Sequence, residues 1–154
     1  MVEKVCLWLA GIALLVLVAL VCAEVVARSV FHFSFEFVEE VGGYLLATLS
    51  FCALAPALAA GSFHRVEFIQ QRMSATARRI AEMMFLSLAL VFTLVMTWFL
   101  TRFVWRSYAQ QDVAPTALQT PLWIPELSMT IGMGAMAITL AAALVAQARR
   151  KNPQ

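Results

Sequence analysis

The sequence predicts an all-α integral membrane protein with four transmembrane helices, and three observations support this fold class. Hydrophobic residues make up 62% of the 154-residue chain, whereas only 13% of the residues are charged. A soluble domain has about one quarter charged residues, so charges this scarce would not cover a globular surface. The mean hydropathy of +0.84 and four long apolar runs indicate that much of the surface faces lipid.

The first apolar run, at residues 5–31, contains no charge from Val5 to Ala23. A helix that crosses the membrane needs about 20 apolar residues, and this run provides them. A signal peptide is the alternative, but the apolar core of a signal peptide is usually about 7–15 residues long. We therefore expect this segment to be retained as a true span.

The other spans are expected at residues 41–60, 80–103 and 122–148, so that residues 1–154 form one four-helix membrane domain. Pro56 lies inside the second span, where proline should kink the helix or change its packing. Small residues recur at helical spacing in the second and fourth spans, which is typical of helices that approach closely in lipid. Frequent alanine alone would also explain these two stripes, which are Ala53, Ala57 and Gly61, and Ala135, Thr139 and Ala143.

The basic residues predict that both chain termini lie in the cytoplasm, an N-in/C-in orientation. With four spans, the termini and the loop between the second and third spans share one side of the membrane. Cytoplasmic segments are enriched in lysine and arginine. Eight basic residues fall on this side, namely Lys4, Arg65, Arg72, Arg78, Arg79, Arg149, Arg150 and Lys151, and three on the other, Arg28, Arg102 and Arg106.

Several functional classes are disfavoured by composition and motifs. The net charge of +2 is too small to suggest nucleic acid, which leaves membrane lipids as the expected surroundings. Cys6, Cys22 and Cys52 lie inside apolar runs and form no CxxC pair, so we interpret them as buried, inert thiols. Since no phosphate loop, metal-ligand cluster or nucleophile triad is present, we expect neither an enzyme nor a cofactor or metal site.

Three acidic residues, at two places in the chain, are candidates for a functional role. Glu24 lies near the outer end of the first span, and Arg28 follows four residues later on the same helical face, so an ion pair is expected. The alternative is a proton- or cation-binding carboxylate, as in a small multidrug exporter. Glu39 and Glu40 fall in the first turn of the second helix, where the helix dipole favours carboxylates. Capping and docking against a partner subunit both explain them.

The loop at residues 114–125 contains three prolines and ends at an aromatic residue, Trp123. Proline fixes the backbone and sets where the next helix begins, so an extended, rigid outer loop is expected. Such a loop suits contact with an outside partner, although a plain interfacial turn explains it nearly as well.

Three motifs resemble those of the small membrane subunit of tripartite ATP-independent periplasmic (TRAP) transporters, the DctQ-like family, and the match runs over nearly the whole chain. They are Arg28-Ser29-Val30-Phe31 with Ser34-Phe35 and Glu39-Glu40; Gly61, His64, Arg65 and Val66; and Pro121-Leu122-Trp123-Ile124-Pro125. The chain departs from the family at Phe37, where tryptophan is common, and at Thr130-Ile131-Gly132, where a proline-glycine pair is common.

The resemblance implies a non-catalytic subunit of a three-part transporter in a bacterial inner membrane. In such transporters a periplasmic binding protein (P) captures an organic acid, and a large membrane subunit (M) moves it inward by a sodium-driven, elevator-type motion. Sodium is expected at the large subunit and not here. The small subunit would scaffold the large one and help to dock the binding protein. Because the sequence starts with Met1, we expect the large subunit to be a separate chain.

The resemblance and the charge pattern together assign roles to ten residues. We expect structural or subunit-interface roles for Arg28, Glu39, Glu40, His64, Arg65, Trp123 and Pro125, and contacts with the binding protein for Arg102, Arg106 and Asp112. Two alternatives are a small subunit of a tripartite tricarboxylate transporter, for which no motif matches, and a membrane anchor of a respiratory complex. The anchor should carry haem ligands or quinone contacts inside its helices, and the sequence has no histidine in mid-span.

Overall fold

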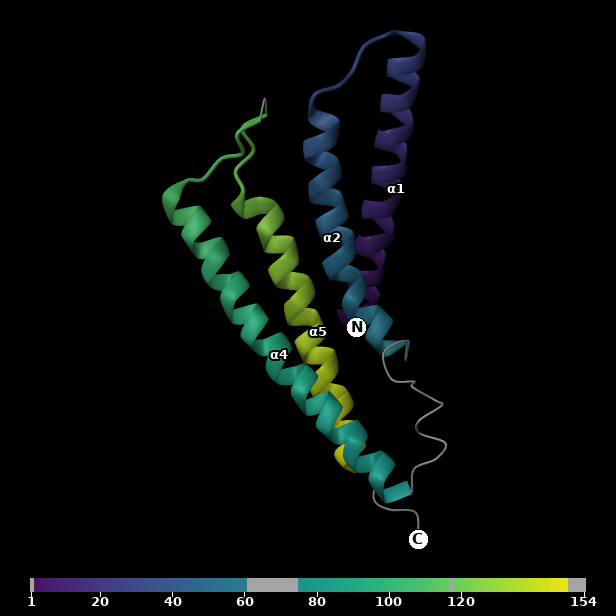
Figure 1. Ribbon diagram of the computed structural model, residues 1–154, viewed down its shortest axis with the longest axis vertical. Helices are drawn as coiled ribbons and strands as arrows, with labels where there is room; N and C mark the ends of the chain where they lie inside the picture. The colour runs from purple at the N-terminus through teal and green to yellow at the C-terminus, as the bar shows by residue number, and fades with distance from the viewer. Residues whose placement is uncertain (1, 61–74, 117, 150–154) are drawn as a thin grey trace.

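Four long helices make up the structure, a computed structural model that describes residues 2–60, 75–116 and 118–149 (Figure 1). They are α1 (Val2–Val30), α2 (Phe37–Ala59), α4 (Ala75–Gln110) and α5 (Trp123–Arg149). Each is long and apolar enough to cross a membrane. The predicted all-α fold with four transmembrane helices is therefore confirmed, whereas the N-in/C-in orientation stays a prediction.

The helices extend beyond the apolar runs, most clearly in α4, which was expected at residues 80–103 but runs from Ala75 to Gln110. Backbone hydrogen bonding continues where the hydrocarbon ends, because polar side chains one turn apart stabilise both ends. Arg78 pairs with Glu82 at 3.1 Å at the start, and Arg106 Nε donates to Gln110 Oε1 at 3.2 Å at the finish.

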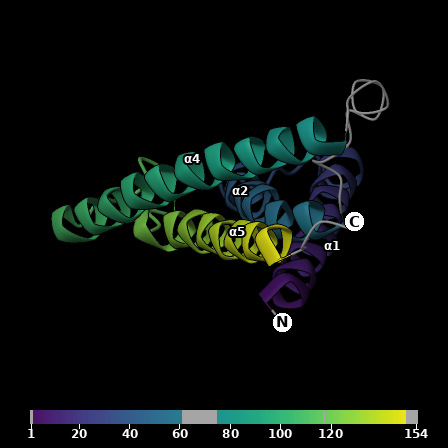
Figure 2. The ribbon, with the colours of Figure 1, turned by 90° about the horizontal axis from the view of Figure 1, so that it is seen from below.

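The four helices form a single row in the order α1, α2, α5, α4. The main contacts join α1 to α2, α2 to α5 and α5 to α4, and a smaller one joins α1 to α5. Figure 2 shows α1 and α4 on opposite sides of the central pair. We call the end with residues 31–36 and 111–122 the loop end, and the opposite end, where α1 begins and α5 finishes, the terminal end.

The central pair, α2 and α5, is held at very close range by a glycine. A Cβ atom added at Gly132 would lie 2.5 Å from the carbonyl carbon and 2.6 Å from the carbonyl oxygen of Phe51. One turn nearer the loop end, the Thr48 hydroxyl donates to the Ser128 hydroxyl at 2.9 Å. Small residues and interhelical hydrogen bonds are the usual basis of helix association in lipid, where apolar burial provides little driving force.

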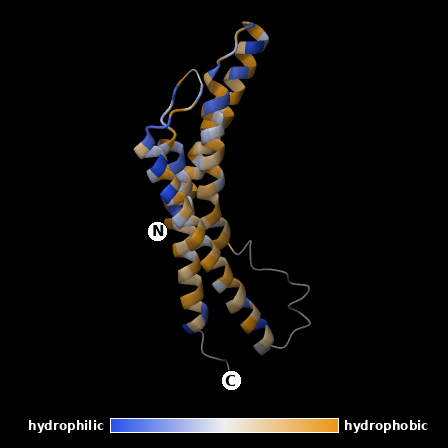
Figure 3. Ribbon diagram, turned by 60° about the vertical axis from the view of Figure 1, so that its left-hand side comes forward, coloured by the Kyte–Doolittle hydropathy of each residue, from blue (hydrophilic) through white to orange (hydrophobic). Residues whose placement is uncertain are grey.

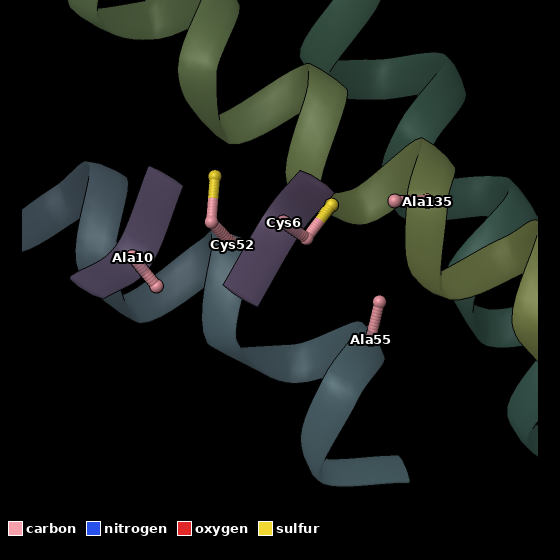
Figure 4. Close-up of a cluster of buried hydrophobic side chains, with 5 residues drawn as sticks. All are labelled: Cys6, Ala10, Cys52, Ala55 and Ala135. Carbon is pink, nitrogen blue, oxygen red and sulfur yellow. The ribbon is translucent and has the colours of Figure 1, made fainter. Parts of the chain in front are cut away.

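Below this crossing, small side chains fill the centre of the row. One cluster of buried residues joins α1, α2 and α5 and consists of Cys6, Ala10, Cys52, Ala55 and Ala135 (Figure 4). A second cluster joins α2, α4 and α5 through Leu58, Leu86 and Leu140. The expected small-residue stripe of α5 lies in this interface, with Ala135 and Thr139 buried.

The small residues that α2 buries are not the ones expected from the sequence. Cys52 and Ala55 are the fully packed positions, whereas Ala53 and Ala57 are only half-buried and Gly61 lies outside the described residues. Pro56 stands close to the end of α2, which continues to Ala59, and its carbonyl accepts a hydrogen bond from Ala60 N at 2.9 Å.

Most large apolar side chains of α1 and α4 are exposed, including Trp8 at 74% and Phe85 at 76%. Hydrophilic residues gather near the helix ends and the loops, whereas the middle of the row is hydrophobic (Figure 3). Apolar surface on this scale in a chain with four spans is the kind of surface that lipid covers.

The glycine crossing yields a test with a matched control. Gly132→Ala should destabilise the protein by about 1–3 kcal/mol, because the added methyl group forces α2 and α5 apart. Gly134→Ala should change the free energy of unfolding by less than about 1 kcal/mol, since a Cβ there meets nothing within 4 Å. Denaturant or thermal unfolding in detergent, followed by circular dichroism, measures both. Equal stability of the two variants would contradict the packing described here.

Candidate functional site

The predicted ion pair between Glu24 and Arg28 is confirmed at the loop end of α1. Arg28 Nη2 lies 3.1 Å from Glu24 Oε1, and the side chain of Glu24 is only 12% exposed whereas that of Arg28 is 65% exposed. A carboxylate near the membrane interface is stabilised by such a partner, because an isolated charge loses hydration there.

Glu24 also holds the loop that follows α1, a role that the sequence did not reveal. The Ser34 hydroxyl donates to Glu24 Oε1 at 2.6 Å, and the Phe35 backbone N–H donates to Glu24 Oε2 at 2.9 Å. Arg28 Nη2 donates to the Ser34 hydroxyl oxygen at 3.0 Å as well. The loop can reverse direction here because His32 adopts the left-handed conformation, with φ at 54°. Both carboxylate oxygens of Glu24 are therefore used inside the chain.

A cleft of about 370 Å³ opens beside this network, between the end of α1 and the start of α2. Eight residues line it: Glu24, Val25, Arg28, Ser34, Phe35, Glu36, Val38 and Glu39. Glu36 and Glu39 are exposed, and among the described residues their side chains have no hydrogen-bond or ion-pair partner. We call this region the Arg28 cleft.

Glu40, next to Glu39 in the sequence, has a different role. Its carboxylate accepts hydrogen bonds from the Tyr44 hydroxyl at 2.8 Å and from the Thr116 hydroxyl. Thr116 belongs to the loop between α4 and α5, so Glu40 ties the start of α2 to that loop. Of the two acidic residues in the first turn, Glu40 therefore faces the chain itself and Glu39 faces outward.

The loop between α4 and α5 folds back on itself, which corrects the extended loop expected from its prolines. Gln111 ends α4 in the left-handed conformation with φ at 52°, and Asp112 N donates to Ser107 O at 3.1 Å, as in a Schellman cap. An antiparallel bridge then pairs Val113 with Pro121. Proline fixes φ but does not prevent reversal when neighbouring residues supply left-handed turns, as Gln119 does with φ at 47°.

The remaining sequence-predicted residues are distributed over the loop end. Arg102 and Asp112 are exposed, and Arg106 is exposed and bonded to Gln110. Trp123 stacks edge-to-face on Tyr108, with 5.8 Å between the ring centroids, and Pro125 is buried in the first turn of α5. His64 and Arg65 lie outside the described residues.

Glu126 is a buried polar residue that the sequence reasoning missed. It is only 7% exposed, and its Oε2 atom has no hydrogen-bond partner within the described part of the chain. Ser107 on α4 is 3% exposed, and its hydroxyl is likewise without a partner there. An acidic residue in the first turn of a helix is usually interpreted as stabilising the helix end, so the sequence does not indicate that Glu126 is buried.

The cysteines show one further correction. Cys6 and Cys52 are buried as expected, but Cys22 is exposed on α1. Among residues 2–60, 75–116 and 118–149, no group of three or more histidine, cysteine or acidic side chains is arranged to hold a metal ion.

Comparison with known protein families shows which family the sequence of this chain matches. Residues 17–150 match a family model described as "Tripartite ATP-independent periplasmic transporters, DctQ component". The matched region includes the second half of α1 and all of the other three helices. No curated protein matches the chain. The resemblance inferred from the sequence motifs is confirmed by this match.

The Glu24 network can be tested at a single backbone amide. Glu24→Ala should accelerate hydrogen exchange of the Phe35 amide by about tenfold, because that N–H loses a charge-assisted acceptor. Glu36→Ala is the matched control and should leave the exchange unchanged, since Glu36 makes no such contact. Hydrogen exchange of the protein in lipid nanodiscs measures both. An unchanged Phe35 amide in Glu24→Ala would refute the anchoring role.

Proposed function

Because this chain belongs to the DctQ family, the small membrane subunits of TRAP transporters in the inner membrane, we propose that it scaffolds the large elevator subunit and helps to dock the periplasmic binding protein. The transporter would drive uptake of an organic acid with a sodium gradient, and we assign the sodium sites to the large subunit. The subunit itself is non-catalytic in this proposal. The observation that carries it is the family match across residues 17–150 on a chain with four membrane-spanning helices.

The proposed orientation places the loop end in the periplasm. Eight of the eleven basic residues lie near the N-terminus, at residues 65–79 or at residues 149–151, which favours the cytoplasm for these parts. The Arg28 cleft and the folded loop between α4 and α5 would then face the side from which the binding protein approaches.

The scaffolding role is supported by the open row of helices. The helices at its two edges, α1 and α4, expose large apolar side chains along their length, so a long surface is available to partner helices. Membrane helices associate through packing and a few polar contacts, not through hydrophobic burial. Glu39, whose side chain makes no hydrogen bond or ion pair among the described residues, is our candidate for the joint with the large subunit.

The docking role is supported by the length of α4. Its 36 residues extend over about 54 Å, well beyond the hydrocarbon thickness of about 30 Å. Arg102 and Arg106 lie in its last turns, and Asp112 follows directly, so these charges would stand at or above the membrane surface. They are our candidates for contacts with the binding protein. The family match also favours this function over the tricarboxylate-transporter and respiratory-anchor alternatives.

Reconstitution tests the proposed function directly. In vesicles, this chain alone should move no organic acid, whereas the chain with the large subunit and the binding protein should give sodium-dependent uptake. Charge reversal at both Arg102 and Arg106 should lower uptake several-fold without reducing recovery of the membrane complex, because only docking is affected.

Charge reversal at Arg149, in the last turn of α5 at the terminal end, is the control and should leave docking intact. Sodium-coupled flux from this chain alone would refute the supporting role. Full uptake by the Arg102 and Arg106 variant would remove those residues from the docking surface.

Substitutions at the adjacent residues Glu39 and Glu40 distinguish a contact with the large subunit from a contact within this chain. Glu40→Ala should lower the thermal midpoint of the isolated chain, because it removes the contacts with Tyr44 and Thr116. Glu39→Ala should leave that midpoint unchanged but reduce co-purification of the large subunit several-fold. Thermal unfolding and quantitative pull-down measure the two effects, and normal co-purification with Glu39→Ala would contradict the assignment.

A further inference from the structure

The Arg28 cleft has a location and a lining that its role in holding the loop leaves unexplained. It opens where α1 leaves the apolar region, so its contents lie at the level of lipid headgroups. Its volume of about 370 Å³ falls within the range of about 300–1,000 Å³ that is usual for sites that bind small molecules. Val38 and Phe35 form an apolar part of the lining, and both are at least half-buried.

The charges on the cleft form two poles. One is the Arg28 guanidinium, whose Nη2 is held by Glu24 and Ser34 while the side chain stays 65% exposed. A guanidinium has five N–H donors, so further donors remain for an anion such as a phosphate. The other pole consists of Glu36 and Glu39, two exposed carboxylates without partners among the described residues. Glu24 also lines the cleft but is already paired with Arg28. A ligand with a negative group for the remaining donors of Arg28 and a positive group for the two free carboxylates would therefore complement the lining.

An exposed apolar stripe leads from the cleft toward the middle of the membrane. Val25 lines the cleft and is 58% exposed. Along the same face of α1, at steps of three and four residues, follow Val21 at 47%, Val18 at 52% and Leu14 at 46% exposure. About half of each of these side chains is exposed, so this face of α1 can contact a hydrocarbon chain that lies along the helix.

We propose that the Arg28 cleft binds the headgroup of a zwitterionic phospholipid with a primary ammonium group, phosphatidylethanolamine in chemical class. Its phosphate lies against Arg28, its ammonium between Glu36 and Glu39, and an acyl chain along Val25, Val21 and Val18. An ammonium donates three hydrogen bonds to carboxylates, whereas a choline group donates none and a glycerol headgroup carries no positive charge. Phosphatidylglycerol would place its phosphate against Arg28 as well, but it would leave the carboxylates of Glu36 and Glu39 without a cation.

This site extends the proposed function without depending on it. If Glu39 helps to bind the large subunit, as proposed above, it does so through the lipid that is bound to it. Lipid binding is a property of the isolated chain, so it can be tested when no partner is present.

The test is native mass spectrometry of the purified, delipidated full chain titrated with lipids of matched acyl chains. Phosphatidylethanolamine should bind about tenfold more tightly than phosphatidylglycerol, the ratio expected for one charge-assisted contact. The double variant Glu36→Gln and Glu39→Gln should lose this preference. Arg28→Gln should weaken both lipids, since both carry a phosphate. Should Arg28→Gln fail to fold, the preference lost in the double variant still decides the question.

Two controls report on charge in general. Glu3→Gln, at the terminal end of α1, and Arg102→Gln, at the loop end of α4, should keep the wild-type preference. Equal binding of the two lipids to the wild-type chain, or an unchanged preference in the double variant, would overturn the proposal.

Discussion

The close approach of α2 and α5 at Gly132 is the contact on which the arrangement of the other helices depends. In a bilayer, apolar side chains gain little by leaving lipid for protein, so helices associate where their backbones fit closely. Gly132 permits that fit against Phe51, and the Thr48–Ser128 hydrogen bond fixes the register one turn away. The edge helices then pack onto this pair, α1 mainly on α2 and α4 mainly on α5.

Carboxylates provide the second level of organisation, at the loop end. Glu24 fastens the segment after α1, and Glu40 fastens the loop between α4 and α5, so each carboxylate of a helix end orders a neighbouring loop. Near the interface such hydrogen bonds compete with less water than they would on a soluble protein. Both connections thereby become fixed parts of the surface that meets the periplasm in the proposed orientation.

The sequence predicted what depends on hydropathy and on short spacing. Four apolar runs predicted four helices, and the separation of four residues predicted the ion pair between Glu24 and Arg28. It did not predict the bond between Thr116 and Glu40, which are 76 residues apart. It also did not predict the order of the helices.

Burial was equally difficult to predict, because a membrane helix is apolar on faces that meet lipid as well as on faces that meet protein. Cys6 is buried and Cys22 is exposed although both lie in the same apolar run, and the buried Glu126 stands where an acidic residue normally caps a helix. Hydropathy distinguishes residues in the membrane from residues in water, but it does not distinguish residues that face lipid from residues that face a neighbouring helix.

The single-layer arrangement has a consequence for the life of the subunit in the cell. Four helices in a row bury less surface against one another than four helices in a closed bundle. Much of the stability of such a chain must therefore come from its contacts with neighbouring proteins and lipids in the membrane. A copy made without its companions would be the least protected against membrane-bound proteases.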